Sequence, residues 1–391
     1  MKSSLSAIEA GWIGIAGSTG LIYHSEMGDL PSKVRQLMVD SLSIRNFRSF
    51  KEAEVRKCAR INVIVGDNGC GKTSLLEGLF LASGASPELA VRTRGWRGLE
   101  AQQMSGDHND IWNALFSDLF HGFDASKSAS ISMKGQNSEN RSISIQMAKA
   151  RIVAPRRNMP GEPPRVIPFR APIQFVYKVR NEPDDIVEPY FDQGNIQFTP
   201  AIHNDPLKVS FYASNRTPPH QESAKRFSEL SQNFKQVAFQ EQFSRIYPTI
   251  SDISVELSGG APALFAAVKG LSRKIPLTLA SGGMNKLVAI MLAMSAQQGG
   301  LVLIDELENG FYYSHMPVIW ESILSFSREF NCQVFASTHS YECLSVAAEL
   351  AKEFPSEFSI IRAMKKDGET QLHSYGGAKF ADAIEENIEI R

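Results

Sequence analysis

Residues 61–74 read INVIVGDNGCGKTS, and this stretch decides the fold. An apolar run, Val63–Val65, leads directly into the pattern G-x-x-x-x-G-K-[ST]. The run predicts a buried parallel strand, and the apolar residues after Ser74 predict a helix with an apolar face. A strand, a glycine-rich loop and a helix in this order form a cradle for phosphate, because the N–H groups of the loop and of the helix N-terminus point at the anion.

Every residue of this loop has an expected place at the phosphates. The nucleotide-binding residues that we expect are Gly66, Asp67, Asn68, Gly69, Cys70, Gly71, Lys72, Thr73 and Ser74. Lys72 would reach the β- and γ-phosphates, and the hydroxyl of Thr73 can ligate Mg²⁺. The helix N-terminus can lower the pKa of the Cys70 thiol, although a small space-filling side chain is the simpler interpretation.

The length and composition bound the remaining choices. A chain of 391 residues can form one large α/β domain with an insertion, or two domains. The net charge of −1 excludes a protein that coats nucleic acid by bulk charge, although a local basic patch stays open. The four cysteines form no C-x-x-C pair and suggest neither a zinc site nor a disulfide framework, so a reducing cytoplasm fits best.

Residues 1–37 form an expected N-terminal extension of unknown role. Its apolar segment, Trp12–Tyr23, is broken by three glycines, and Glu9 precedes it. This pattern predicts neither a signal peptide nor a membrane span, and no other stretch approaches about 18 consecutive apolar residues. We therefore expect no membrane contact and a domain that covers residues 38–391.

Alternating and continuous apolar runs predict the other elements. A hairpin is expected over 39–65 with its turn at 46–50, and the helix after the loop should end near Ala82. One helix is expected over 221–246, with Phe227, Leu230, Phe234 and Val237 on one side. Residues 86–204 are expected to form an inserted lobe, since they carry many Pro, Gly and aromatic residues and no heptads. The predicted strands cover 129–133, 142–147, 173–179, 209–213, 358–363 and 370–375.

A second cluster of motifs follows in the last third of the chain. The apolar run Leu301–Ile304 ends in Asp305 and Glu306, where the first carboxylate can hold the Mg²⁺ shell and the second can polarise the attacking water. This pattern is weak alone, but it gains weight downstream of the phosphate loop. The strand 333–337 runs into a polar turn with His339, about 30 residues later. That spacing favours a functional histidine over an ordinary surface one.

A Ser-Gly-Gly turn precedes the helical run 287–296. The turn consists of Ser281, Gly282 and Gly283, and its free N–H groups at a helix N-terminus predict a second anion site. A competing match at 258–260 is expected to be a turn between strands, because Pro262 and alternating apolar residues follow it.

The motifs GDNGCGKT, ASGGM, LVLIDE, ENG and STHS, in this order, resemble the ATP-binding-cassette (ABC) class of P-loop ATPases. NFRSF before the loop, DELENGFYYSHM and the closing Glu389-Ile390-Arg391 resemble more narrowly the RecF/OLD-like group. This group is often called AAA family, has an SMC-like head and recurs in bacterial anti-phage systems. The resemblance covers roughly residues 38–85 and 205–391. It implies an α/β fold of the ABC-ATPase type, with a mixed sheet, a β-rich N-terminal lobe and a helical or irregular insertion.

The resemblance also implies roles and cofactors. ATP and Mg²⁺ would be bound, with Thr73 and Asp305 at the metal and Lys72, Glu306 and His339 as catalytic residues; Glu306 would be the base and His339 the γ-phosphate sensor. Ser281, Gly282 and Gly283 would contact the γ-phosphate across a dimer, and Asn309 and Gly310 would form the D-loop. Met284 replaces the usual glutamine, Ala280 precedes the serine, and no Q-loop glutamine is identified. The timing of hydrolysis is therefore the least determined part of the mechanism.

The implied function is an ATP-hydrolysing dimeric switch, slow and regulatory, that controls a partner effector in anti-phage defence. Only about 50 residues follow Ser340, which leaves no room for the Toprim nuclease of OLD proteins, so the effector activity would come from a partner or from the insertion. A RecF-like maintenance ATPase that binds DNA directly is the alternative. A small-molecule kinase would need neither the Ser-Gly-Gly turn nor His339, and a transporter ATPase fits the large insertion poorly.

Residues 141–180 are strongly basic. They contain a single acid, Glu162, and nine basic residues, Arg141, Lys149, Arg151, Arg156, Arg157, Arg165, Arg170, Lys178 and Arg180. One interpretation is a solvated loop whose arginines pair with the acids at 182–188. The other is a proline-rich, extended lid that contacts nucleic acid or an acidic partner.

Overall fold

The structure is a computed structural model. It describes residues 38–84, 90, 93–94, 113–136, 139–148, 169–170, 173–192, 195–199, 207–214, 220–296 and 298–385. The extension at 1–37, the closing Glu389–Arg391 and the five basic residues Lys149, Arg151, Arg156, Arg157 and Arg165 lie outside the described residues.

The phosphate loop belongs to a six-stranded sheet. Its strand order is β10 (Val209–Tyr212), β14 (Leu301–Ile304), β15 (Gln333–Ser337), β3 (Ile61–Val65), β16 (Phe358–Lys366) and β17 (Glu369–Gly376). The first five strands are parallel, and only β17 is antiparallel to its neighbour. All residues of β3, β14 and β15 are buried, as their continuous apolar runs predict. The carboxyl ends of these three central strands therefore meet at one edge, where ligands bind in open α/β sheets.

A second sheet is antiparallel and contains the described strands of the insertion. Its order is β2 (Phe50–Val55), β1 (Val39–Phe47), β4 (Ala129–Gly135), β5 (Asn140–Met147), β7 (Ile173–Val179), β8 (Asp185–Asp192) and β6 (Phe169–Arg170), with β9 (Asn195–Thr199) on β8. The hairpin β1–β2 turns at Arg48 and Ser49, as predicted. Because β4 pairs directly with β1, the described part of 86–204 extends the sheet that the N-terminal hairpin begins.

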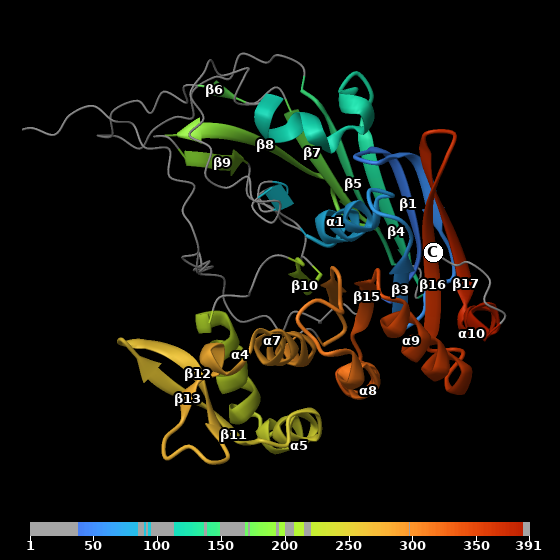
Figure 1. The fold of residues 1–391 in the computed structure, drawn as a ribbon. Coiled ribbons are helices and arrows are strands. Elements are labelled where there is room, and N and C mark those ends of the chain that lie inside the picture. The colour runs from blue at the N-terminus through green and yellow to red at the C-terminus, as the bar shows by residue number, and fades with distance from the viewer. Residues whose placement is uncertain are drawn as a thin grey trace, which may run out of the picture.

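Helix α1 (Lys72–Ser83) lies between the two sheets (Figure 1). It contacts β4 and β5 on one side and β10, β14 and β15 on the other, so every residue except Thr73 is buried. A helix that is apolar all round is expected in such a place. The helix packs closely on β1 at Gly78, where a Cβ would make ordinary van der Waals contact with the Ile44 side chain at 3.5 Å and the Phe47 ring at 3.6 Å. The phosphate loop and its helix are thus held by both sheets.

Helices cover the other face of the parallel sheet. They are α7 (Gly282–Ala296), α8 (Met316–Glu329), α9 (Tyr341–Glu353) and α10 (Gly377–Glu385). Trp320 is fully buried between α8 and α9, and its indole N–H donates to the carbonyl of Cys343 at 3.0 Å. A small third sheet, β11 (Ile250–Ser258), β12 (Ala261–Val268) and β13 (Ile275–Pro276), projects beside them (Figure 1). Its first turn contains Gly259 and Gly260 at positive φ, which confirms that the match at 258–260 is a turn between strands.

The prediction of a single helix over 221–246 is wrong. The chain forms α4 (His220–Gln232) and α5 (Gln236–Ile246), and the break lies at Phe234, which has a φ of 58° and is 88% exposed. A left-handed residue cannot continue a right-handed helix, so the apolar side changes direction here. Phe234 and Val237 therefore lie at the surface, whereas Phe239 and Phe243 enter the core in their place.

Among the described residues, no helix combines the length and the apolar character that a membrane crossing requires.

Candidate nucleotide site

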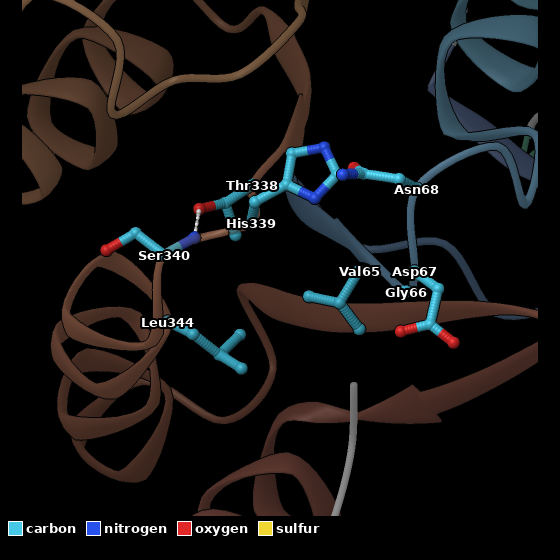
Figure 2. A pocket seen from close by; sticks show the side chains of 8 residues that line it. All are labelled: Val65, Gly66, Asp67, Asn68, Thr338, His339, Ser340 and Leu344. Atoms are coloured by element: carbon cyan, nitrogen blue, oxygen red, sulfur yellow. Dashed lines mark hydrogen bonds between the residues drawn. The ribbon is translucent and has the colours of Figure 1, made fainter.

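The phosphate loop and the segment after β15 line a pocket at the carboxyl edge of the parallel sheet. The cavity has a volume of about 280 Å³, and its lining residues are Val65, Gly66, Asp67, Asn68, Thr338, His339, Ser340 and Leu344. Figure 2 shows the imidazole ring of His339 and the amide of Asn68 facing each other across this pocket. The sequence motifs around Lys72 and His339, more than 250 residues apart, therefore meet here.

Glycine at position 66 is required by both backbone conformation and space. Gly66 has a φ of 137°, and a Cβ there would lie 1.9 Å from the carbonyl oxygen of Ala363 on β16. Gly71, at a φ of 94°, turns the chain directly into α1. No L side chain fits the first position, and the second favours glycine strongly. The loop thus folds tightly around the N-terminus of α1, which is the geometry that phosphate binding needs.

Lys72 is buried at the start of α1, and its ammonium is held by the loop itself. The Nζ atom donates to the carbonyls of Gly66 at 2.6 Å and Asp67 at 2.9 Å. Burial lowers the pKa of Lys72, while nearby acids, among them Asp305 and Glu306, raise it. These two carbonyls hold the ammonium inside the loop, where it can bind phosphate oxygens as a charged donor.

The two expected metal ligands are in direct contact. The hydroxyl of Thr73 donates to Oδ2 of Asp305 at 3.0 Å, and the hydroxyl of Ser337 donates to Oδ1 of the same carboxylate at 2.6 Å. Asp305 is only 5% exposed, so its charge is directed at these partners. A hydroxyl and a carboxylate oxygen beside a phosphate cradle form a donor set that suits Mg²⁺.

Glu306 lies in a left-handed turn directly after β14. Its φ is 49°, and its backbone N–H donates to the Ser337 hydroxyl at 2.8 Å. The amide of Asn309 donates to Oε2, and Nε2 of His339 lies 3.6 Å from Oε1. The side chains of Glu306 and His339 are each about one-third exposed, so water can reach the carboxylate. An oriented and accessible carboxylate can serve as a general base.

The Ser-Gly-Gly turn forms the N-terminus of α7, as predicted. The Ser281 hydroxyl caps the helix by accepting the N–H of Met284 at 3.0 Å. Ser281 and Gly282 are exposed, whereas Gly283 is buried against Gly310, where a Cβ would lie 2.3 Å from the carbonyl oxygen. None of the three turn residues lines the pocket described above.

Two further expectations are decided by burial and pairing. Cys70 is 1% exposed, and burial raises the pKa of its thiol, which favours the simpler interpretation of a space-filling side chain over a lowered pKa. In the basic segment, Arg141 is buried with its Nε 3.4 Å from Glu139, and Lys178 pairs with Asp184 at 2.6 Å. The Lys178–Asp184 pair fits the interpretation in which basic residues pair with the acids at 182–188, whereas Arg141 is buried in β5 and its partner Glu139 is not one of those acids.

Sequence reasoning assigned no role to three side chains that hold the site together. Ser337 bridges Asp305 and the backbone of Glu306, and Glu308 accepts the backbone N–H of His339 at 2.7 Å. Lys286 of α7 donates to backbone carbonyls of the Glu306 turn. The sequence did contain a signal for Ser337. Its hydroxyl stands at the carboxyl end of β15, the strand beside β14.

We expect Ser337→Ala to lower the ATPase kcat by about 10- to 100-fold, because Asp305 and the Glu306 turn each lose their hydrogen bond to the hydroxyl. Phosphate release at saturating ATP measures this. The matched control is Ser345→Ala, which removes a hydroxyl that donates to the carbonyl of Tyr341 within α9. An unchanged kcat in Ser337→Ala would show that the bridge has no part in hydrolysis.

A family model described as "AAA domain, putative AbiEii toxin, Type IV TA system" matches residues 61–345, from the P-loop strand into α9. The chain belongs to this AAA domain family. The match spans well over half of the chain and includes the motifs from the phosphate loop to STHS; NFRSF and the closing Glu389-Ile390-Arg391 lie outside it.

Relatives and solved structures agree with the AAA domain assignment. An "ATP/GTP phosphatase" of Helicobacter pylori is 22% identical over 350 residues, which are 81% of this chain and 89% of the relative. The "DNA replication and repair protein RecF" of Idiomarina loihiensis is 44% identical over only 45 residues, 12% of this chain and 13% of that protein. The structure titled "Crystal structure of the SmcHead bound to the C-winged helix domain of ScpA" has a TM-score of 0.51 at 13% identity and covers 86% of this chain and 97% of that one.

An SMC head with an extended coiled coil, bound to a domain of ScpA derived from Pyrococcus furiosus, has a TM-score of 0.52 at 12% identity and covers 89% of this chain and 99% of that one. At such identities the likeness shows the fold alone. The fold is the P-loop ATPase fold of SMC heads, with the predicted mixed α/β sheets, and the protein is an ATP-binding ATPase of the ABC type.

Proposed function

We propose that this AAA domain protein is an ATP-driven switch that closes as a head-to-tail dimer around two nucleotides. One observation carries the proposal: the pocket contains the phosphate loop and His339, whereas the predicted anion-binding turn, with Ser281 and Gly282 exposed, does not line it. In this proposal, each phosphate loop needs a Ser-Gly-Gly turn to complete its site. That turn comes from a second copy of the chain.

Exposed apolar side chains around that turn support the same conclusion. Leu279 precedes it and is 73% exposed, and Tyr312 and Tyr313, which follow the turn of Gly310, are 61% and 63% exposed. Gly283 packs on Gly310, so these side chains lie on the two segments that meet there. Aromatic and aliphatic residues around a free helix N-terminus suit a protein interface better than open solvent.

The proposed reaction uses the contacts already described. The loop and Lys72 hold the β- and γ-phosphates, and a water attacks the γ-phosphorus while its proton passes to Glu306. The bond from that phosphorus to the bridging oxygen breaks, and ADP leaves with the electron pair. Mg²⁺, held by Thr73 and Asp305, would neutralise charge on the phosphate oxygens. His339 would donate to the γ-phosphate, and the partner's Ser-Gly-Gly turn would bind it from the other side.

The output of the switch is proposed to be a partner effector, a nuclease or a toxin, in anti-phage defence. The family description, which names a toxin of a type IV toxin–antitoxin system, supports this assignment. We further propose that hydrolysis is slow and regulatory, that residues 38–391 act as one ATPase domain, and that the protein works in the cytoplasm. The four free and buried thiols fit a reducing compartment.

A RecF-like function is the second candidate, because RecF proteins of several bacteria match over short stretches. ATPase assays with and without duplex DNA distinguish the two candidates. Stimulation by DNA, together with binding that falls steeply with salt, would favour direct DNA maintenance. An ATPase rate that responds to a co-expressed effector and not to DNA would favour the switch.

The composite site predicts complementation between two inactive variants. Lys72→Ala removes the phosphate cation, and Gly282→Asp places a carboxylate where the proposed dimer brings the γ-phosphate. In a mixed dimer, one of the two sites combines a wild-type loop with a wild-type turn. Mixing the two variants is therefore expected to restore ATPase activity to about a quarter of wild type, if half of the dimers are mixed and half of their sites are intact. Activity of the mixture equal to the sum of the separate pools would contradict a shared site.

A further inference from the structure

Lys286 places a cation between helix α7 and the turn that carries Glu306. Its Nζ donates to the carbonyls of Glu306 at 2.7 Å, Leu307 at 3.2 Å and Asn309 at 3.0 Å. A lysine ammonium has three N–H donors, and this arrangement uses all of them on one short turn. The ammonium also lies 5.6 Å from the ring centre of Phe311, which continues the same segment.

The surroundings of Lys286 keep it charged despite its burial. Burial lowers the pKa of Lys286 to about 8, and the charges of Glu308, Glu306 and Asp305 act in the opposite direction. The thiol of Cys343, which also faces it, is neutral at pH 7, because burial raises the thiol pKa to about 12. At pH 7 the group is therefore an ammonium, which the neighbouring carboxylates and the backbone oxygens of the Glu306 turn stabilise.

That turn needs support. Glu306 has a φ of 49°, a conformation that costs an ordinary side chain free energy unless its surroundings stabilise it. The backbone N–H of Glu306 donates to the Ser337 hydroxyl, and the Lys286 ammonium donates to the backbone carbonyl of Glu306. The first contact comes from β15 and the second from α7. The orientation of the Glu306 carboxylate thus depends on the position of α7 relative to this turn.

Helix α7 is the element that begins with the Ser-Gly-Gly turn. Lys286 follows Gly282 by four residues, about one helical turn, so the two lie on the same face of the helix. Gly283 packs against the carbonyl of Gly310, so the helix start and the segment after Glu306 touch at two places. A backbone contact and three hydrogen bonds therefore join the helix start to the turn.

We propose that Lys286 is a positioning residue, which ties the direction of Glu306 to the helix whose N-terminus carries the Ser-Gly-Gly turn. This proposal rests on the proposed function, in which that turn binds the nucleotide of the partner subunit and Glu306 acts on the nucleotide of its own subunit. Lys286 is then the link through which nucleotide at one site adjusts the base at the other.

The test uses Lys286→Met, Lys286→Arg and Glu306→Gln in the full chain. Methionine keeps an unbranched side chain and removes only the ammonium, so Lys286→Met is expected to lower kcat by about 10- to 100-fold, as a misplaced catalytic group does. The Kd for a fluorescent ATP analogue should change less than about threefold, because the phosphate loop is untouched. Arginine retains a charged donor and should recover part of the rate.

A double variant shows whether Lys286 acts through Glu306. If it does, Lys286→Met combined with Glu306→Gln hydrolyses ATP no more slowly than Glu306→Gln alone. The matched control is Lys235→Met, which removes an ammonium that lies 4.7 Å from the centre of the Phe330 ring, directly after α8, and should leave kcat unchanged.

Four results would overturn the inference. A normal kcat in Lys286→Met would do so, and so would a joint loss of kcat and nucleotide affinity without recovery in Lys286→Arg, which is the behaviour of a purely structural residue. Additive losses in the double variant would show that Lys286 acts apart from Glu306. Full activity of Glu306→Gln would overturn the proposed base and this inference together, whereas an inactive Glu306→Gln beside a fully active Lys286→Met would overturn the inference alone.

Discussion

Replacing Lys72 with alanine is expected to raise the Kd for ATP at least about 100-fold, equivalent to about 2.7 kcal/mol. The ammonium lies in the loop on the carbonyls of Gly66 and Asp67, and its removal leaves the β- and γ-phosphate charges without a cation in a buried cradle. Binding of a fluorescent ATP analogue measures the loss directly. The fold should persist, because burial lowers the pKa of Lys72 and the substitution removes a charge that burial disfavours.

The matched control for this variant is Lys51→Ala on the neighbouring strand β2. Lys51 is exposed, and its ion pair with Glu369 lies outside the pocket lining, so ATP affinity should stay at the wild-type value. Wild-type affinity in a folded Lys72→Ala protein would remove the assignment of residues 66–74 as the phosphate cradle.

Glu306→Gln is expected to bind ATP normally and to hydrolyse it about 100- to 1,000-fold more slowly. An amide cannot take the proton of the attacking water, and general base catalysis contributes rate factors of this order. Glutamine has nearly the same shape, and its oxygen can still accept the Asn309 amide, so the turn should keep its conformation. The measurements are single-turnover phosphate release and equilibrium binding on the same preparation.

The same variant provides a test of assembly. If the two nucleotides hold the proposed dimer together, ATP-loaded Glu306→Gln should elute as a dimer and wild type should return to monomer after hydrolysis. Glu321→Gln, at an exposed position on α8, is the matched control and should behave as wild type. Hydrolysis by Glu306→Gln at the normal rate would place the base on another residue.

Sequence patterns predicted those parts of the fold that depend on contiguous residues alone. The strand, loop and helix of 61–83 and the strand before Asp305 are continuous apolar runs with sharp ends, and the structure has them within a residue or two. The partners of each strand were not predictable in this way. Alternating strands such as β4 carry information about which side is buried, and none about which strand lies beside them.

The candidate site was predictable to a similar extent: the residues of local motifs were predicted, and the contacts between distant elements were not. Lys72, Thr73, Asp305 and His339 belong to local motifs that fix their place at strand ends, and the structure brings their segments together. The contacts of Ser337 and Lys286 depend on how β15 and α7 meet the turn after β14, which no single stretch encodes. The break at Phe234 was missed for the opposite reason, since one backbone conformation outweighed an otherwise helical pattern.

The place of β3 in its sheet also sets the order in which the protein can be built during synthesis. Its neighbours are β15 and β16, which follow it by about 270 and 300 residues. The apolar strand β3 therefore leaves the ribosome before the two strands that pair with it have been synthesised. The antiparallel lobe can form first, because β1 and its partner β4 are separated by only about 90 residues in sequence. The nucleotide pocket is completed only when the last quarter of the chain emerges, so a nascent chain cannot respond to ATP before almost all of it has been translated.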